Sequence, residues 1–376
     1  MARVATPGSP APAASQGSPV ATPLPDEPRG RRKIIDLNNV TVTVSSVKYT
    51  PPFRFKRRKL TLIKDVSFHA YEGEILGLIG ESGAGKSTIL RCITGQMKPS
   101  AGTVNVAGVD VVHHKNEAIK RFGYVPQLEL ISVYDHFSAL ENVYYFGKMY
   151  LSGVSDEQIK QRGREVLGIL GFKEALMDKK AKHLSGGEKK RVSIAIGMVH
   201  DPEILLLDEP TTGLDISLRI QVLNYLKNLN KKLGISVVIV SHDLEIAQYC
   251  SRIVLLEKGR VIEFGDPEVL INKLLPCEGR AIKLEVAELN EEIIESIRAL
   301  PEVKFVIKTG RNDVKIFAED IDKVMISKII EHCENINIPI VSITLDRADF
   351  TSYYRIKSKL EKEKQKAINS DPANSP

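Results

Sequence analysis

The sequence of 376 residues has no tryptophan, four cysteines and few aromatic side chains, which make up 6% of the chain. No window of about 18 apolar residues occurs, so we predict that the chain does not span a membrane by itself. The first 30 residues lack the apolar core of a secretory signal, which argues against secretion. We expect reduced, mostly buried thiols in a cytosolic protein, because the cysteines lie far apart without metal-ligand spacing. They are Cys92, Cys250, Cys277 and Cys333.

Neither sign of charge dominates the composition. Lys and Arg number 53 and Asp and Glu 47, which gives a formal charge of +6. This excess is too diffuse to predict nucleic-acid binding, and we expect no nucleic-acid partner. The hydrophobic fraction of 43% is ordinary for a globular protein. At roughly 150 residues per domain, the length predicts two domains with a tail.

Residues 1–33 form a tract rich in Pro, Ala and Ser, with seven prolines between Pro7 and Pro28. Such a segment cannot bury enough apolar surface to offset the entropy lost on ordering, so we predict a disordered tail. An organellar transit peptide is the weaker alternative, because arginine is scarce before Arg29 and acidic residues are present.

An α/β pattern begins at Ile34 and predicts one domain over residues 34–275. Runs without polar alternation indicate strands buried on both faces, and helices between them indicate a parallel sheet. A stretch with helical spacing interrupts this alternation and predicts a helical subdomain over about residues 128–185. The predicted strands are 35–44, 62–70, 74–79, 204–207 and 235–240, and the predicted helices include 216–233.

Residues 276–348 predict a second, smaller α+β domain. Its elements follow the order βαββαβ, which is that of the ferredoxin-like fold. Beyond it, residues 349–376 are rich in charge and predict a solvated helix that frays. The predicted strands of the small domain are 281–286, 303–308, 313–317 and 339–345, and its predicted helices are 291–300 and 321–333.

A glycine-rich loop follows the predicted strand 74–79 and precedes a predicted helix. It fits the pattern G-x-x-x-x-G-K-[ST], whose backbone N–H groups and helix N-terminus together bind phosphate. Lys86 is expected to reach the β- and γ-phosphates, and Ser87 is expected to offer its hydroxyl to Mg²⁺. The loop consists of Gly80, Glu81, Ser82, Gly83, Ala84, Gly85, Lys86, Ser87 and Thr88.

Two carboxylates end the buried run 204–207. An aspartate at the carboxyl end of a parallel strand faces the site crevice, so Asp208 is a candidate Mg²⁺ ligand. Glu209 is the candidate base that polarises the attacking water. His242 follows the strand 235–240, where it can hydrogen-bond a γ-phosphate oxygen. We therefore predict Lys86, Glu209 and His242 as the catalytic group.

The segment Leu184-Ser185-Gly186-Gly187-Glu188 opens a basic helix and forms a second anion-binding helix N-terminus. A chain that already has one phosphate loop does not need another, so we infer that this one serves a second copy. With this motif, the sequence over about residues 34–270 resembles the ATP-binding cassette (ABC) ATPases. In that resemblance, 80–88 corresponds to Walker A, Gln127 to the Q-loop, 184–188 to the signature, 204–209 to Walker B, 213–215 to the D-loop, and His242 to the switch histidine.

The resemblance implies a P-loop α/β fold with ATP and Mg²⁺ as cofactors. It implies that two cassettes, most simply a homodimer, hold two ATP molecules head to tail. Ser185, Gly186 and Gly187 of one copy would then contact the γ-phosphate bound by Lys86 of the other. It also places Asp215 at the nucleotide, and Gln127 near the Mg²⁺ held by Ser87 and Asp208.

The resemblance also implies that the chain energises a transporter whose integral-membrane subunits are separate chains, at the cytoplasmic face of the membrane. The amino-acid sequences of segments 141–147 and 211–215 are similar to the corresponding segments of ATPases from drug and polysaccharide exporters. Ferredoxin-like C-terminal domains occur, however, in importers that sense their substrate. A soluble ABC ATPase of translation or repair and an ATPase of cofactor assembly are the alternatives.

The aromatic residue that would stack on adenine is not fixed by the motifs. Val44 stands near the expected position, and Tyr49, Phe53 and Phe55 follow in an insertion. We predict Tyr49. The basic run 54–59 is expected to be a solvated hairpin tip, with contact to anionic lipid headgroups as the alternative.

Overall fold

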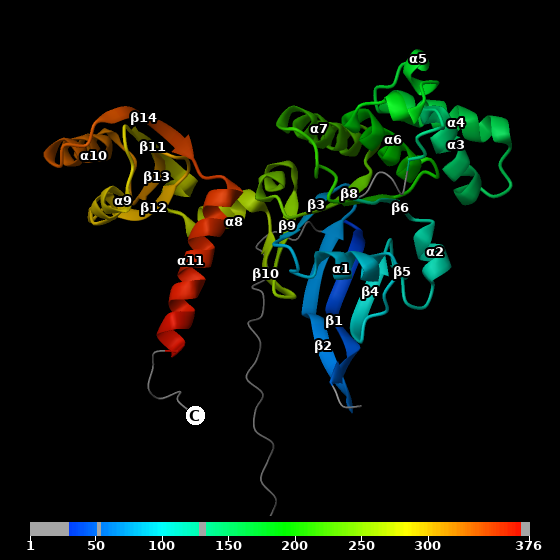
Figure 1. Ribbon diagram of the computed structural model, residues 1–376, viewed down its shortest axis with the longest axis horizontal. Coiled ribbons are helices and arrows are strands. Elements are labelled where there is room, and N and C mark those ends of the chain that lie inside the picture. The colour runs from blue at the N-terminus through cyan, green and yellow to red at the C-terminus, as the bar shows by residue number, and fades with distance from the viewer. Residues whose placement is uncertain (1–29, 51–53, 128–132, 370–376) are drawn as a thin grey trace, which may run out of the picture.

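The computed structural model describes residues 30–50, 54–127 and 133–369, and its elements form three parts (Figure 1). An antiparallel sheet and a mixed sheet with helices make up the cassette, and a small C-terminal unit lies beside it. None of the described helices is both long and apolar enough to cross a bilayer. The prediction of disorder over residues 1–33 falls almost wholly on residues outside the described ranges.

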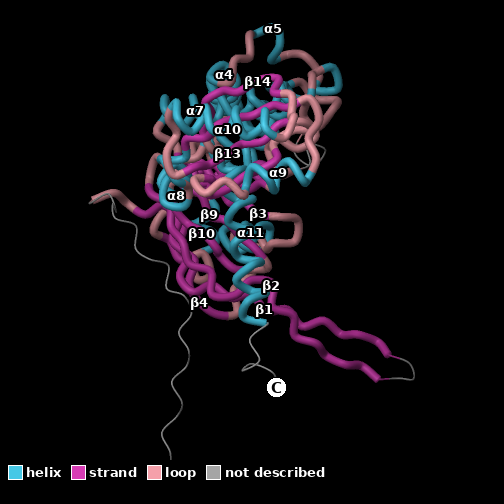
Figure 2. Tube along the Cα trace, turned by 90° about the vertical axis from the view of Figure 1, so that its left-hand side faces the viewer, coloured by secondary structure: helices cyan, strands magenta, loops and turns pink. Residues whose placement is uncertain are grey.

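The antiparallel sheet has the strand order β2-β1-β4-β5. The β1–β2 hairpin is longer than predicted, and its far end projects from the rest of the molecule (Figure 2). The basic run 54–59 falls within β2, and the side chains of 54–58 lie outside the described part, so the lipid alternative stays untested. The strands are β1 (Lys33–Thr50), β2 (Arg54–Tyr71), β4 (Ala101–Val106) and β5 (Val109–Asp110).

A six-stranded sheet with the order β10-β9-β3-β8-β7-β6 carries the phosphate loop. All neighbours in it are parallel except β10 and β9, which confirms the predicted parallel α/β sheet. Residues of β3 alternate between two cores, because Ile79 packs in one apolar cluster and Leu78 in the other. The strands are β3 (Ile75–Gly80), β6 (Phe122–Val125), β7 (Ile204–Asp208), β8 (Ser236–Ser241), β9 (Arg252–Glu257) and β10 (Arg260–Gly265).

The described part of the predicted helical segment, residues 133–185, is mostly helical. Serine side chains cap two of its helices and the helix that follows it in capping boxes, which explains where those helices begin. The segment contains α3 (Ala139–Tyr150), α4 (Asp156–Ile169), α5 (Glu174–Met177) and a short 3₁₀ turn η2 (Ala181–His183), and α6 (Gly186–Met198) follows. The other cassette helices are α1 (Lys86–Ile93), α2 (Lys115–Ile119), α7 (Ile216–Leu233), η3 (Leu244–Tyr249) and α8 (Pro267–Leu274).

The C-terminal unit has the predicted ferredoxin-like fold. Its sheet is antiparallel with the order β12-β13-β11-β14, and an apolar cluster fills the space beneath its two helices. A turn at η4 (Pro276–Gly279) joins it to α8. The elements are β11 (Arg280–Val286), α9 (Glu291–Arg298), β12 (Val303–Lys308), β13 (Asp313–Ala318), α10 (Lys323–Asn335) and β14 (Ile340–Arg347).

The last helix, α11 (Phe350–Asn369), corrects one prediction. Its first half is not solvated, because Phe350, Tyr353 and Ile356 are each at most 5% exposed. They join the apolar core that continues from the C-terminal sheet into the cassette. These three residues are spaced three apart, which is the spacing of a helix that buries one face. The many charged residues around them made this apolar stripe hard to recognise in the sequence. The helix therefore connects the two parts of the protein.

Candidate functional site

The phosphate loop joins the buried strand β3 to α1, as predicted. Its backbone conformation requires glycine: Gly85 has a φ of +106°, and a Cβ there would lie 2.6 Å from Ile63 Cγ2. A Cβ on Gly80 would lie 2.4 Å from the carbonyl oxygen of Leu256. These glycines let the chain turn sharply beside β9 and direct backbone N–H groups at the N-terminus of α1 toward one point.

Lys86 lies at the first position of α1 and is only 7% exposed. Its Nζ donates hydrogen bonds to the carbonyl oxygens of Gly80 at 2.6 Å and Glu81 at 3.0 Å. Burial lowers the pKa of Lys86, and the negative charges of Glu209 and Asp208 oppose that shift. The Lys86 ammonium therefore lies inside the phosphate loop, near the carboxylates of Asp208 and Glu209.

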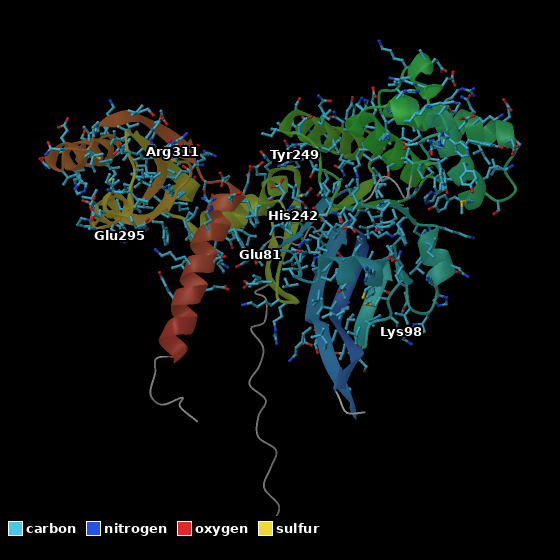
Figure 3. The ribbon with its side chains drawn as sticks, in the orientation of Figure 1. Glu81, Lys98, His242, Tyr249, Glu295 and Arg311 are labelled. Atoms are coloured by element: carbon cyan, nitrogen blue, oxygen red, sulfur yellow. The ribbon has the colours of Figure 1, made fainter. Side chains whose placement is uncertain are left out.

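The remaining predicted residues of the sheet converge because neighbouring strands are parallel. The phosphate loop follows β3, His242 follows β8, Asp208 ends β7, and Gln127 follows β6. These strands are adjacent in the order β3-β8-β7-β6. All four groups therefore lie at the same edge of the sheet, where the parallel strands have their carboxyl ends. Figure 3 shows Glu81 and His242 at this edge. Ser87 and Gln127 are exposed, whereas Glu209 is 8% exposed.

Glu209 is held by three side-chain donors. Its Oε2 accepts hydrogen bonds from Thr212 Oγ1 at 3.2 Å and Ser241 Oγ at 3.4 Å, and it lies 2.8 Å from His242 Nδ1. The Glu209 backbone has a φ of +48°, an uncommon conformation for a residue with a side chain. Its N–H donates to the Val240 carbonyl at 2.8 Å, which fixes that conformation.

The environment of Asp208 disfavours its charged form. Burial raises the pKa of Asp208, the neighbouring Glu209 raises it further, and Lys86 and Arg91 act in the opposite direction. A divalent cation bound there would reverse this balance, because its charge favours ionised carboxylates. Two adjacent carboxylates at a phosphate loop are thus an arrangement that favours a cation.

Among the described residues, no hydrogen bond or ion pair joins the signature to the phosphate loop of the same copy. Ser185 caps α6, and its Oγ accepts from the Glu188 N–H at 3.2 Å. A hollow of about 200 Å³ beside it is lined by residues 185–191 and 218–225, and by none of the phosphate loop. Ser185 and Gly186 are exposed, so the N-terminus of α6 faces outward.

The nucleotide contacts predicted for Asp215 and Tyr49 are not seen in the structure. The Asp215 carboxylate accepts from the Leu218 N–H at 2.9 Å and caps α7, so its contact with nucleotide stays a prediction. Tyr49 lies in β1, but its side chain is outside the described part of the chain. The prediction of adenine stacking is therefore untested.

Sequence reasoning did not assign a role to four residues beside the site. Thr212 and Ser241 hold Glu209, and Tyr124 acts to lower the pKa of Asp208. The first two stand next to recognised motifs, so their hydroxyls were a usable signal. Tyr354 touches Glu81 from the far end of the chain, and no local pattern indicated that contact.

These features define a P-loop nucleotide-binding protein with a second, outward-facing anion-binding helix. The family described as ABC transporter matches residues 63–212. The chain is 34% identical over 275 residues to the linearmycin resistance ATP-binding protein LnrL of Bacillus subtilis, covering 73% of this chain and 86% of that protein. The chain belongs to the ABC transporter family and is an ATP-binding, ATP-hydrolysing subunit of that class.

Other relatives extend this picture. The chain is 40% identical over 215 residues to the methionine import ATP-binding protein MetN of Clostridioides difficile, covering 56% of this chain and 65% of that protein. A dimeric cassette, MJ0796 bound to ADP and Pi, matches with a TM-score of 0.52 and 30% identity over 62% of this chain and 98% of its own. The predicted likeness to exporters is not confirmed, because these relatives include proteins named for import.

Proposed function

We propose that this chain energises a membrane transporter through ATP-driven dimerisation of two copies. The observation that carries the proposal is that Lys86 is buried in the phosphate loop, whereas the signature residues Ser185 and Gly186 are exposed at the N-terminus of α6. A second copy turned head to tail places its α6 N-terminus against the phosphate held by the first copy's loop. The dimeric form of the similar cassette MJ0796 supports this arrangement.

The chemical step follows from the residues around Glu209. Oxygen donors from Ser87, Asp208 and Gln127 fit Mg²⁺, which prefers one or two carboxylates together with substrate phosphates. When bound, the ion would neutralise charge on the phosphates. Lys86 would contact the β- and γ-phosphates, and Glu209 would accept a proton from the attacking water. His242, hydrogen-bonded to Glu209, would orient that carboxylate toward the γ-phosphate side.

An exposed aromatic cluster is the proposed contact with membrane-spanning subunits. Tyr134 is 45% exposed, Tyr145 44% and Met149 68%. The rings of Tyr134 and Tyr145 lie 5.4 Å apart, and Phe137 contacts both. A cluster of exposed rings, here on α3 and the turn before it, is typical of an interface that anchors a partner. The chain would then work at the inner face of a membrane, bound to separate membrane subunits.

The amino-acid sequences of segments 141–147 and 211–215 favour export as the direction of transport. The relatives named for methionine import favour the opposite direction. Vesicles that contain this chain and its membrane subunits decide the question. ATP supplied on the cassette side drives cargo away from that side in an exporter and toward it in an importer.

The decisive experiment is capture of the partner. We would purify the Glu209→Gln protein with ATP in mild detergent and identify what accompanies it. A polytopic membrane protein supports the proposal, whereas ribosomes, nucleic acid or soluble assembly factors contradict it.

The aromatic cluster has its own test. Tyr145→Ala should release the membrane partner and leave ATP hydrolysis by the isolated chain unchanged. An exposed residue of α7, Ile220→Ala, is the matched control, because it is 43% exposed and lies outside the cluster. Equal capture of the membrane partner by both variants contradicts the proposed docking surface.

A further inference from the structure

A groove of about 490 Å³ lies between α11 and β12, the edge strand of the C-terminal sheet. Its apolar wall is formed by Phe305 and Ile307 of β12 and by Ile356 and Leu360 of α11. This volume is within the range of small-molecule sites, which are mostly apolar with a few placed polar groups. The groove is separate from the phosphate loop and from the aromatic cluster.

The rim of the groove is basic. Five Lys and Arg residues line it against a single carboxylate, Glu363. Two of the five are neutralised elsewhere, because Arg298 pairs with Glu295, and Lys304 lies 2.6 Å from Glu319. Lys308 and Lys359 are exposed and form no ion pair with any described residue. The groove therefore offers two uncompensated ammonium groups beside an apolar wall.

The edge of β12 is closed to another strand. The Arg355 guanidinium donates a hydrogen bond to the Lys308 carbonyl oxygen at 2.6 Å, and Arg298 donates to the Val306 carbonyl at 3.5 Å. Addition of a peptide strand requires free backbone groups along the edge. Because arginine side chains occupy these carbonyls, the groove does not favour a β-strand as its occupant.

We propose that this groove binds a single-chain anionic amphiphile of the fatty-acid class. The carboxylate would lie between Lys308 and Lys359, and the acyl chain would lie along Phe305, Ile307 and Leu360. Charge complementarity selects the acid, and burial of methylene groups supplies most of the affinity. A ligand there touches both α11 and the sheet, and so would hold the helix against the C-terminal unit.

Binding in the groove could affect the nucleotide site through α11. Arg355, which lines the groove, follows Tyr354, whose hydroxyl contacts Glu81 of the phosphate loop. A ligand that fixes α11 would thus restrain the contact at Glu81. The binding itself does not depend on the proposed transport function, so each can fail without the other.

The test is titration of the full chain with palmitate, kept below the concentration at which it forms micelles, followed by calorimetry. We expect saturable binding at one site, at least tenfold weaker binding of hexadecanol, which keeps the chain and lacks the charge, and none of acetate. The Lys308→Glu/Lys359→Glu variant should bind palmitate at least tenfold more weakly. The Lys232→Glu/Lys323→Glu variant, with the same change of charge away from the groove, should bind normally.

Hydrogen exchange on the wild-type protein locates the site independently of any variant. Palmitate should slow exchange of the amides of α11 and leave those of α4 unchanged. Equal binding of palmitate and hexadecanol, absence of saturable binding, or protection confined to elements other than α11 and β12 overturns the proposal. Equal affinity of both double variants overturns it as well.

Discussion

The hydroxyl of Tyr354 donates a hydrogen bond to Oε1 of Glu81 across 3.3 Å, although 273 positions separate the two residues. Tyr354 belongs to α11, and Glu81 is the second residue of the phosphate loop. A nearby ion pair between Lys357 and Glu263 also ties α11 to the cassette. The C-terminal unit therefore reaches the nucleotide-binding loop through one helix, and changes in that helix should affect nucleotide binding.

Replacing Tyr354 by Phe keeps the ring and removes the hydrogen bond to Glu81. A net hydrogen bond contributes about 0.5–1.5 kcal/mol, and this partly exposed one lies at the low end, so we expect a twofold to fivefold rise in KM for ATP. The turnover number should not change, because Tyr354 does not touch the reacting groups. Steady-state kinetics against Tyr145→Phe, which removes a remote hydroxyl, checks this. Identical KM values would count against the contact.

Replacing Glu209 by Gln should remove the base and keep the shape of the site. The amide oxygen can still accept from Thr212 and Ser241, so ATP binding should persist. We expect hydrolysis to fall about 10²–10⁴-fold, the usual contribution of a general base. Light scattering at saturating ATP should then show a dimer. The dimer model is falsified if this variant stays monomeric at every ATP concentration.

The carboxylate of Asp349 should make the stability of the fold depend on pH. Burial pushes the pKa of Asp349 upward, but hydrogen bonds from Ser352 and the charge of Lys315 outweigh it and lower the pKa overall. Because the pKa of Asp349 is lower in the folded state, its carboxylate stabilises the fold at pH values above the pKa of the unfolded chain, about 3.9. This stabilisation is lost as the pH falls through the pKa of the folded state.

We therefore expect Asp349→Asn to lower the free energy of unfolding at pH 7 by about 0.5–1 kcal/mol. The difference from wild type should shrink toward zero near pH 3. Urea unfolding at both pH values measures it, with the exposed Asp320→Asn as control. A difference that is equal at both pH values contradicts an ionic role for Asp349.

The four cysteines should differ in reactivity. Burial raises the pKa of Cys250 to about 12 and that of Cys92 to about 11, and it also raises the pKa of the buried Cys333. Thiolate is the reactive form, so these three should react slowly at pH 8. Cys277 is half-buried and should be the one fast thiol toward Ellman's reagent. Cys277→Ser should abolish the fast phase, and a fast phase that survives contradicts the assignment.

Much of the fold could be predicted from local pattern. The buried runs that became β3, β7 and β8 have no polar alternation, and the βαββαβ order of the C-terminal unit matches the observed sheet. The signature was recognisable because a serine and two glycines precede a basic helix, and the structure places Ser185 at the N-cap of α6. The length of the β1–β2 hairpin was not predicted, because the basic run 54–59 was interpreted as an insertion at a hairpin tip and not as part of a strand.

The sequence by itself determined the chemistry of this protein: a glycine loop with Lys86, carboxylates at Asp208 and Glu209, and a second anion-binding helix at Ser185. Each depends on residues within a few positions of one another, whose backbone geometry is local. Only the tertiary structure decided that Ser241 holds Glu209, that α11 buries Phe350 and Tyr353, and that Tyr354 meets Glu81. Such contacts join distant segments, and they depend on how strands pair and which face of a helix is covered, which a local pattern does not encode.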